Sequence, residues 1–183
     1  ADVRYVGGCV RDAIAKRPVA DIDIGTPEPP ETVVERLGKA GIKAIPTGID
    51  HGTITAVADG HAFEVTTLRC DVETDGRRAV IAYTEDWIVD SSRRDFTING
   101  LFYDVQTEEV IDHVGGLEDL EARLIRTIGD PNIRFQEDPV RMLRVVRFAA
   151  KLDFGIEKHS ATPIRPLAPM LRDIPSARLF EEV

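Results

Sequence analysis

The predicted fold depends most on the stretch VRYVGGCVRDAIAKRPVADIDI, residues 3–24. Residues 3–6 have the apolar pattern of a short strand, and Gly7 and Gly8 then turn the chain into a helix that ends near Lys16. Residues 19–24 alternate between apolar and polar side chains, which predicts a second strand. A strand, a glycine turn, a helix and a further strand in close succession indicate a mixed α/β domain.

The remaining sequence divides into a strand-rich part and a helical part. It predicts a helix over residues 31–39, strands over 42–45, 52–58 and 62–68, a mobile loop over 69–86, a new element at 95–103 and a short helix after the glycines at 115–116. Apolar residues then recur at helical spacing through residues 134–152, namely Met142, Val145, Val146, Ala149 and Leu152. The proline-rich tail predicts broken helices. We therefore expect an α/β head over residues 1–133 and the start of a helical domain over residues 134–183.

Composition excludes a membrane protein and leaves a nucleic-acid partner open. Hydrophobic residues make up 43% of the chain, no apolar run approaches the roughly 18 residues of a membrane span, and no N-terminal signal is present. Cys9 and Cys70 form no metal-ligand pair, which fits a reducing cytoplasm.

The net charge of −9 divides unevenly: residues 1–133 carry 14 Lys and Arg against 25 Asp and Glu, whereas residues 134–183 carry 9 against 7. The acidic front suits divalent cations and the basic back suits phosphates.

The strongest chemical signal is the pair Asp21 and Asp23. Residues two apart on a strand point to the same side, so we expect both carboxylates to face away from Ile22 and Ile24. Such a pair repels itself unless a cation lies between the two, and Mg²⁺ prefers carboxylate oxygens together with phosphate and water. Glu64, on a predicted neighbouring strand, is a third candidate carboxylate. An exposed strand residue is an equally good interpretation of Glu64.

Three further segments contain candidate nucleotide-binding residues. Gly7 and Gly8 allow close approach of a phosphate to the backbone, and Arg11 lies one turn into the helix. The segment RRDFTIN, residues 93–99, places Arg94 for phosphates and Asp95 and Asn99 for ribose hydroxyls, although a charged surface turn has the same composition.

The third segment is EDPVRMLRVVR, residues 137–147. Asp138 and Arg141 flank the apolar stripe of the predicted helix, where charges need partners and a base edge is one candidate. Arg144 and Arg147, together with Lys151, are expected on the solvent face opposite that stripe. Phosphate contact is the second interpretation of these three.

Taken together, these segments resemble the bacterial class II tRNA nucleotidyltransferase and poly(A) polymerase family. The motifs that carry the resemblance occur in order: VGGCVRD at 6–12, DIDI at 21–24, RRDFTIN at 93–99, DHVGGLEDL at 112–120 and EDPVR at 137–141. The resemblance implies a polymerase-β-like head with a mixed sheet and a helical neck. It implies two-metal catalysis with Mg²⁺ on Asp21 and Asp23, and triphosphate contacts from Gly8, Arg11 and Arg94. It also implies that Asp138 and Arg141 bind the incoming base in place of a template, with Arg144 and Arg147 at nucleotide-contacting positions.

Different segments of the chain resemble the two branches of this family. Residues 46–53 and 63–69 look like the CCA-adding branch, whereas residues 137–152 and 173–182 look like the poly(A) branch. Family members are about twice as long, so the body and tail domains are expected to be missing. The first-choice function is CCA addition to tRNA from CTP and ATP, and the second is poly(A) addition to RNA 3′ ends. A nucleotidyltransferase acting on a small molecule would not need the neck residues Asp138 and Arg141. A non-catalytic RNA-binding module would have lost a metal carboxylate and gained aromatic stacking platforms.

Overall fold

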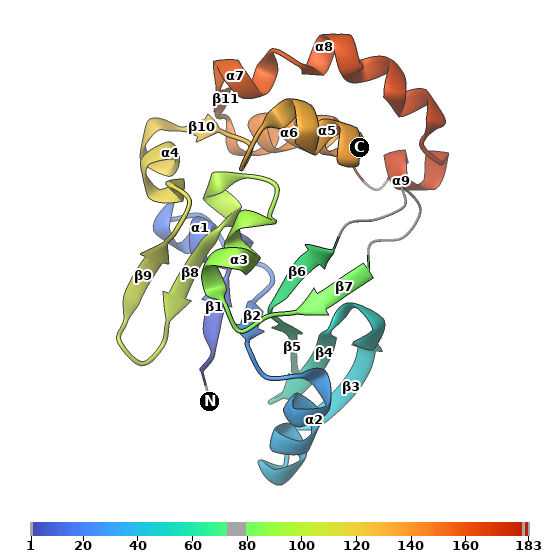
Figure 1. Cartoon of the computed structure of the whole chain (residues 1–183). Coiled ribbons are helices and arrows are strands. Elements are labelled where there is room, and N and C mark those ends of the chain that lie inside the picture. Colours follow the sequence, from blue (N-terminus) through green and yellow to red (C-terminus); the bar gives the residue numbers. More distant parts are fainter. Residues whose placement is uncertain (1, 73–79, 181, 183) are drawn as a thin grey trace.

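The head of the molecule is a mixed β-sheet, as the sequence predicts. The computed structural model describes residues 2–72, 80–180 and 182 (Figure 1). Within these residues the main sheet has seven strands in the order β3-β4-β5-β2-β1-β8-β9, and only the β2–β5 pair is parallel. The strands are β1 (Arg4–Val6), β2 (Asp23–Thr26), β3 (Lys43–Gly48), β4 (Thr53–Ala58), β5 (His61–Thr67), β8 (Leu101–Asp104) and β9 (Glu109–Asp112).

Helices cover both faces of this sheet. Tyr5, Ile24 and Val65 are consecutive register partners and share one face, which packs against α1 (Gly8–Ile14) and α2 (Pro30–Lys39). Val6 and Phe102 are partners on the other face and pack on Trp87 of α3 (Trp87–Ser92). Gly25 on this second face leaves room for the indole, since a Cβ there would lie 3.1 Å from Trp87 Cζ3.

Part of the segment expected to be a mobile loop consists of paired strands. β6 (Arg69–Val72) pairs antiparallel with β7 (Val80–Tyr83), and Arg69 lies opposite Tyr83. The prediction of a loop over residues 69–86 was therefore wrong for residues 69–72 and 80–83, whereas residues 84–86 form no helix or strand. The backbone hydrogen bonds of an antiparallel pair do not require apolar side chains, so the lost periodicity did not exclude strands. Residues 73–79, at the centre of the predicted loop, lie outside the described residues.

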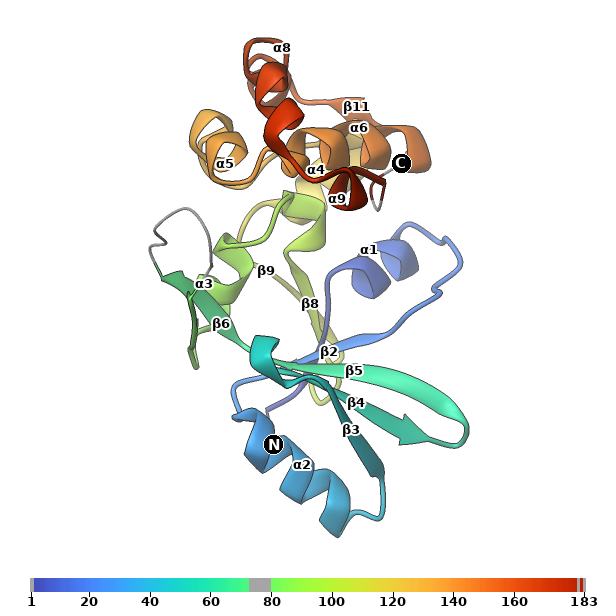
Figure 2. The same cartoon turned by 90° about the vertical axis from the view of Figure 1, so that its right-hand side faces the viewer.

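The helical part lies above the sheet in two perpendicular views (Figures 1 and 2). It contains α4 (Gly116–Ala122), α5 (Pro131–Glu137), α6 (Val140–Leu152), α7 (Lys158–Ala161), α8 (Ile164–Leu167), the 3-10 turn η3 (Ala168–Asp173) and α9 (Ser176–Phe180), with short strands β10 (Leu124–Ile125) and β11 (Gly155–Ile156) pairing in parallel. The tail is broken into short helices, as its prolines predict. The continuous helix expected over residues 134–152 is instead two helices. Asp138 has extended backbone angles because it precedes Pro139, and that position disfavours the α conformation.

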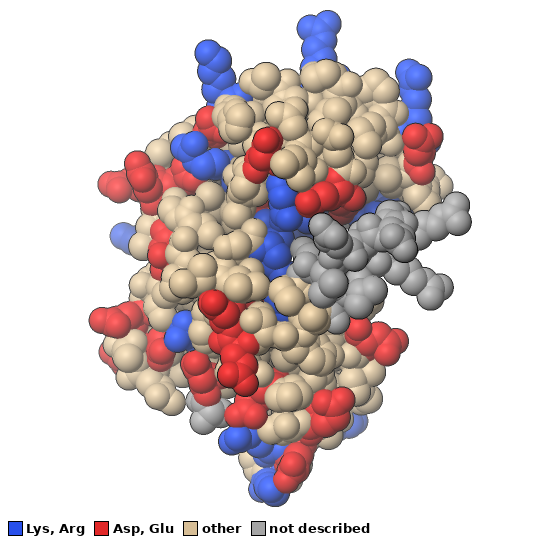
Figure 3. Space-filling view, viewed as in Figure 1, with Lys and Arg blue, Asp and Glu red and all other residues tan. Residues whose placement is uncertain are grey.

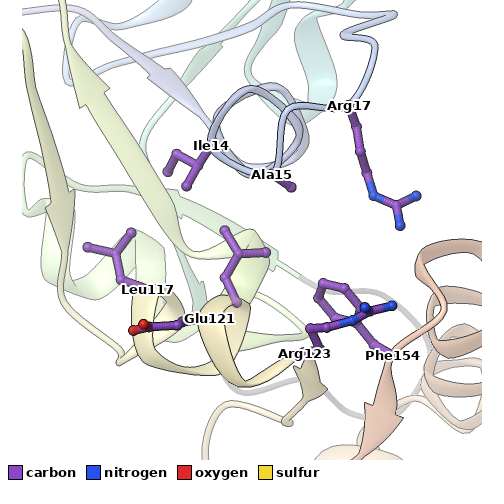
Figure 4. Close-up of a pocket in the computed structure, with 8 residues that line it drawn as sticks. Ile14, Ala15, Arg17, Leu117, Glu121, Arg123 and Phe154 are labelled. Atoms are coloured by element: carbon purple, nitrogen blue, oxygen red, sulfur yellow. The ribbon is translucent and has the colours of Figure 1, made fainter.

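The strand-rich and helical parts share one hydrophobic core. Cys9 and Val10 of α1 lie in the same buried cluster as Met142, Val145 and Phe148 of α6. At the edge of this junction, Arg17 extends from the end of α1 and donates a hydrogen bond of 2.6 Å to the Leu152 carbonyl at the end of α6. Figure 4 shows the pocket of about 540 Å³ that Arg17 borders, and none of the predicted nucleotide-binding residues lines it. The helical part is thus packed directly on the head.

Candidate nucleotidyl-transfer site

The predicted metal carboxylates lie at the start of β2, beside β5. Asp23 is the first residue of β2 and is the register partner of Glu64 on β5, so these two carboxylates lie on the same face of the sheet. Asp21 precedes the strand and is exposed, so the expectation of a strand over residues 19–24 was wrong at its beginning. Pairing with β1 and β5 begins only at Asp23 or Ile24 and extends to Thr26, beyond the predicted end.

Negative charge accumulates at this corner of the sheet. Burial raises the pKa of Asp23, the nearby Glu64 and Asp21 carboxylates raise it further, and Arg94 partly offsets the shift. Among the described residues, no three Asp, Glu, His or Cys side chains converge closely enough to hold a metal ion by themselves. Asp21 and Asp23 thus supply two carboxylates, and Glu64 lies beside them on β5. Such a group suits a cation that takes its remaining ligands from phosphate and water.

Gly7, at the turn before α1, brings the backbone close to Arg94. Gly7 has a φ of 70°, a conformation that glycine adopts without steric cost. A Cβ at Gly7 would lie 3.1 Å from Nη1 of Arg94, so the guanidinium packs directly against the turn. Because Arg94 also acts on the charge of Asp23, it lies between the two predicted halves of the site. A polyphosphate bridging the metal carboxylates and the glycine turn would meet this guanidinium.

Sequence reasoning missed Asp90, which holds Arg93 and Arg94 in place. Asp90 is 1% exposed, and its carboxylate forms ion pairs of 2.9 Å with both arginines. It also accepts a hydrogen bond from the Arg69 backbone N–H. These contacts outweigh the effect of burial and lower the pKa of Asp90. The spacings of three and four residues to the two arginines are those of neighbours on a helix, so this signal was present in the sequence.

Arg11, Asn99 and Asp95 form a buried group beneath the glycine turn. Arg11 is 4% exposed and donates to both carboxylate oxygens of Asp12 at 2.8 and 2.9 Å. Its Nη1 donates to Oδ1 of Asn99 at 2.6 Å. Asn99 donates in turn to Asp95 at 3.1 Å. The sequence predicted all three as nucleotide-binding residues, and the structure brings them together through contacts with one another.

Asp138 and Arg141 lie at the break between α5 and α6. Nη2 of Arg178, on α9, donates to both oxygens of Asp138 at 3.2 and 3.0 Å. Nη1 of Arg141 donates to Glu137 at 2.9 Å and to the Arg134 carbonyl at 3.0 Å. Both side chains are partly buried on the flank of α6, as expected, but Asp138 lies before the helix rather than within it.

Arg144 and Arg147 are not on a solvent face. Each retains 36% of its side-chain exposure, and both form ion pairs with Glu182, at 3.7 and 2.6 Å respectively. Arg144 also forms an ion pair of 2.8 Å with Asp95. Val146, expected in the apolar stripe, is instead 51% exposed, because the buried face of α6 runs through Met142, Val145, Phe148 and Leu152. Lys151 is exposed, as expected.

The distribution of charged side chains on the surface agrees with the positions of these arginines and carboxylates. Figure 3 shows Lys and Arg side chains gathered in a hollow between the helical part above and the strands below, with Asp and Glu around it. An acidic chain thus concentrates basic side chains at the junction of its two parts. No helix among the described residues is long and apolar enough to cross a membrane.

Comparison with known proteins places this site in a family. A family model described as the poly A polymerase head domain matches residues 3–126. The chain belongs to this family. A second model, described as the probable RNA and SrmB-binding site of polymerase A, matches residues 153–183. The expected resemblance and the expected head fold are both confirmed.

Curated relatives of this chain include CCA-adding enzymes. The enzyme of Lactobacillus helveticus is 40% identical over 180 residues, covering 97% of this chain and 44% of the relative. The enzyme of Bacillus pumilus is 42% identical over 159 residues, covering 86% of this chain and 38% of the relative. The chain therefore spans less than half the length of these relatives.

Solved structures agree over nearly the whole chain. The Bacillus stearothermophilus CCA-adding enzyme in complex with CTP matches with a TM-score of 0.89 at 37% identity, covering 99% of this chain and 43% of that one. A tRNA nucleotidyltransferase complexed with a primer tRNA and an incoming ATP analog matches with a TM-score of 0.81 at 29% identity, covering 99% of this chain and 51% of that one.

Proposed function

We propose that this chain supplies the catalytic head and the beginning of the neck of an enzyme that adds CCA, or part of it, to the 3′ end of tRNA. CTP and ATP are its substrates. The observation that carries the proposal is the match of 99% of the chain, at 37% identity, to a CCA-adding enzyme solved with CTP. We assign residues 1–133 to the head and 134–183 to the neck, in a cytoplasmic setting where tRNA and nucleoside triphosphates are available.

Asp21 and Asp23 are the residues that would hold Mg²⁺. The raised pKa of Asp23, which burial and the Glu64 and Asp21 carboxylates cause, indicates unbalanced negative charge that a cation would offset. When bound, such ions activate the attacking hydroxyl and stabilise the leaving pyrophosphate. Glu64 completes the carboxylate group from the neighbouring strand. Arg94, against the turn at Gly7, would bind and orient the triphosphate for in-line attack by the RNA 3′ oxygen.

Asp138 and Arg141 would select the base. A carboxylate accepts hydrogen bonds from an exocyclic amine, and a guanidinium donates to ring nitrogens and carbonyls. Cytosine and adenine both present an amine beside a ring acceptor, whereas uracil and guanine present a carbonyl in place of that amine. Within the described part of the chain, the two side-chain hydrogen bonds of Arg141 both come from Nη1, and a guanidinium has five N–H donors. It therefore retains donors for a base.

A specific observation also favours poly(A) addition as a second candidate. Both matching family models are named after poly A polymerase, and the second covers the tail at 153–183. Poly(A) addition would use the same carboxylates and the same triphosphate contacts but would accept ATP alone. The two functions therefore differ in base selection and in when addition stops.

Product sequencing separates the two functions. The full-length protein that carries this head and neck is purified and incubated with Mg²⁺, a tRNA that ends before CCA, and each NTP alone or in mixture, and the RNA 3′ ends are sequenced. CCA addition predicts that CTP is incorporated first, that ATP follows, and that extension then stops. Extended adenosine tracts from ATP alone would replace the first proposal with the second. Absence of transfer from any NTP would overturn both.

A further inference from the structure

A chain of buried polar contacts crosses from the head to α6. It begins at Arg11, whose Nη1 donates to Asn99 Oδ1 at 2.6 Å, and continues from Asn99 Nδ2 to Asp95 Oδ1 at 3.1 Å. Asp95 Oδ2 then lies 2.8 Å from Nη2 of Arg144 on α6. Arg11, Asn99 and Asp95 are 4%, 8% and 9% exposed. Solvent therefore screens the charges in these contacts poorly. Each contact also restricts the orientation of the next side chain in the series.

Asn99 is held in one orientation within this chain. Its carbonyl oxygen faces a guanidinium, which only donates, and its amide nitrogen faces a carboxylate, which only accepts. Rotating the amide by half a turn would oppose like groups at both ends. The backbone is fixed as well, because Asn99 ends the 3-10 turn η2 (Thr97–Asn99), which follows the fully buried Phe96 and contains the fully buried Ile98.

The chemistry on either side explains why a neutral amide occupies this position. Arg11 and Asp12 form one ion pair, and Asp95 and Arg144 form another. Asn99 connects the two without adding charge. A second contact runs in parallel, since the Arg11 guanidinium lies 5.3 Å from the ring centre of Phe148 on α6. Arg11 therefore contacts the helix at whose start Asp138 and Arg141 lie.

We infer that Asn99 is a positioning residue that couples Arg11 in the head to Arg144 on the neck helix and does not itself bind the ribose. This inference rests on the proposed function, in which Arg11 serves the triphosphate and α6 serves the base. A shift of α6 on binding a correct base would be transmitted through Asp95 and Asn99 to Arg11. Triphosphate binding and base selection would then be linked by residues that touch neither group.

Binding measurements with three probes test the inference. Asn99→Leu removes both hydrogen bonds while keeping the branched shape and the number of heavy atoms, and Asn99→Asp keeps the acceptor for Arg11 but places a carboxylate against Asp95. We expect Asn99→Leu to weaken the binding of CTP, dCTP and inorganic tripolyphosphate by a similar factor, about tenfold, because the loss arises at Arg11. Asn99→Asp should weaken the binding of all three probes to a smaller extent. A change in the CTP to dCTP ratio would overturn the inference and indicate a ribose contact.

The coupling itself is tested by a double-mutant cycle with Arg144→Met. If Asn99 links the two sites, the double variant should bind CTP no more than a fewfold worse than either single variant, because each substitution already breaks the chain. Multiplicative effects would contradict the coupling. Asn132→Leu on α5 and Arg172→Met in η3, both at exposed positions outside the site, are the matched controls and should leave affinity unchanged. A lower melting temperature with unchanged affinities would reduce Asn99 to a structural role.

The two proposals fail in distinguishable ways. If the wild-type protein extends tRNA while Asn99→Leu binds all three probes normally, only the coupling is wrong. If it extends no RNA but binds CTP with the predicted dependence on Asn99, only the proposed function is wrong. A wild-type protein that binds none of the probes would overturn both.

Discussion

The guanidinium of Arg94 directs two hydrogen bonds, from Nε and Nη2, to a single carboxylate oxygen of Asp90, at 3.2 and 2.9 Å. Asp90 is almost completely buried, and Arg94 retains one-fifth of its side-chain exposure. The third nitrogen of Arg94, Nη1, is the atom that lies against the turn at Gly7. A buried carboxylate thus fixes the direction in which a partly exposed guanidinium points.

Replacing Asp90 with Asn tests this relationship. The shape is preserved, but the counter-charge for Arg93 and Arg94 is lost, so we expect about tenfold weaker NTP binding and a loss of about 1–3 kcal/mol in unfolding free energy. Calorimetric titration and denaturant unfolding measure the two effects. Because the pKa of Asp90 is lowered in the folded state, its contribution is present above its ordinary value of 3.8 and is lost as the pH falls. Asp86→Asn, at the exposed helix cap, is the control and should leave both stability and affinity nearly unchanged, because Asn caps a helix about as well as Asp. Unchanged binding in Asp90→Asn would refute the positioning role.

Asp23→Asn should separate catalysis from stability. We expect nucleotide addition to fall by about 100- to 1,000-fold, since a group that serves the transition-state charge is removed. The same variant should be slightly more stable than the wild type at pH 7 without metal. The raised pKa of Asp23 means that ionisation disfavours the folded state, so the difference between the variants should vanish as the pH falls below 3.8. Asp21→Ala should show the same loss of activity. Near-normal turnover in either variant would exclude the metal assignment.

Asp138→Ala should reduce the selectivity among the four bases more than it weakens the binding of the triphosphate. A site built on hydrogen bonds rejects a wrong partner because buried polar groups are left unpaired, so discrimination against UTP and GTP should fall by about tenfold or more. The measurement is kcat/KM for all four NTPs. The rival explanation is structural, because Asp138 also accepts from the Val140 N–H at the start of α6 and pairs with Arg178. In that case the variant would lose stability and keep its preference among bases.

Asp112→Asn should destabilise the head without touching the site. One oxygen of Asp112 accepts hydrogen bonds from the backbone N–H groups of Val114, Gly115 and Gly116, and the other from that of Leu117, at 2.9–3.0 Å. Burial raises the pKa of Asp112, but these donors outweigh it and leave the pKa lowered. We expect a loss of about 1–2 kcal/mol at pH 7. The difference from the wild type should shrink at pH values below 3.8, since the stabilisation requires the carboxylate. An equal difference at pH 3 and pH 7 would contradict this account.

The sequence by itself determined many of the local elements and identified the candidate carboxylates. Alternating residues predicted β4 and β5, the turn at Gly7 and Gly8 predicted α1, and Asp23 and Glu64 were placed on neighbouring strands. These features depend on side-chain periodicity, backbone freedom and charge, which are properties of residues close together in the sequence. The ordered motifs added the family, and the family model that matches residues 3–126 confirmed it.

Only the tertiary structure decided which charges are paired and where they point. Arg144 forms an ion pair with Asp95, although helical periodicity alone placed it on the solvent face of α6. The pairing of β6 with β7 joins residues on either side of a polar segment, and local periodicity did not predict it. Asn99 contacts a residue 88 positions away, and Asp138 one that is 40 positions away. Partners so distant in sequence are selected by packing of the helical part on the sheet, and no local pattern encodes that geometry.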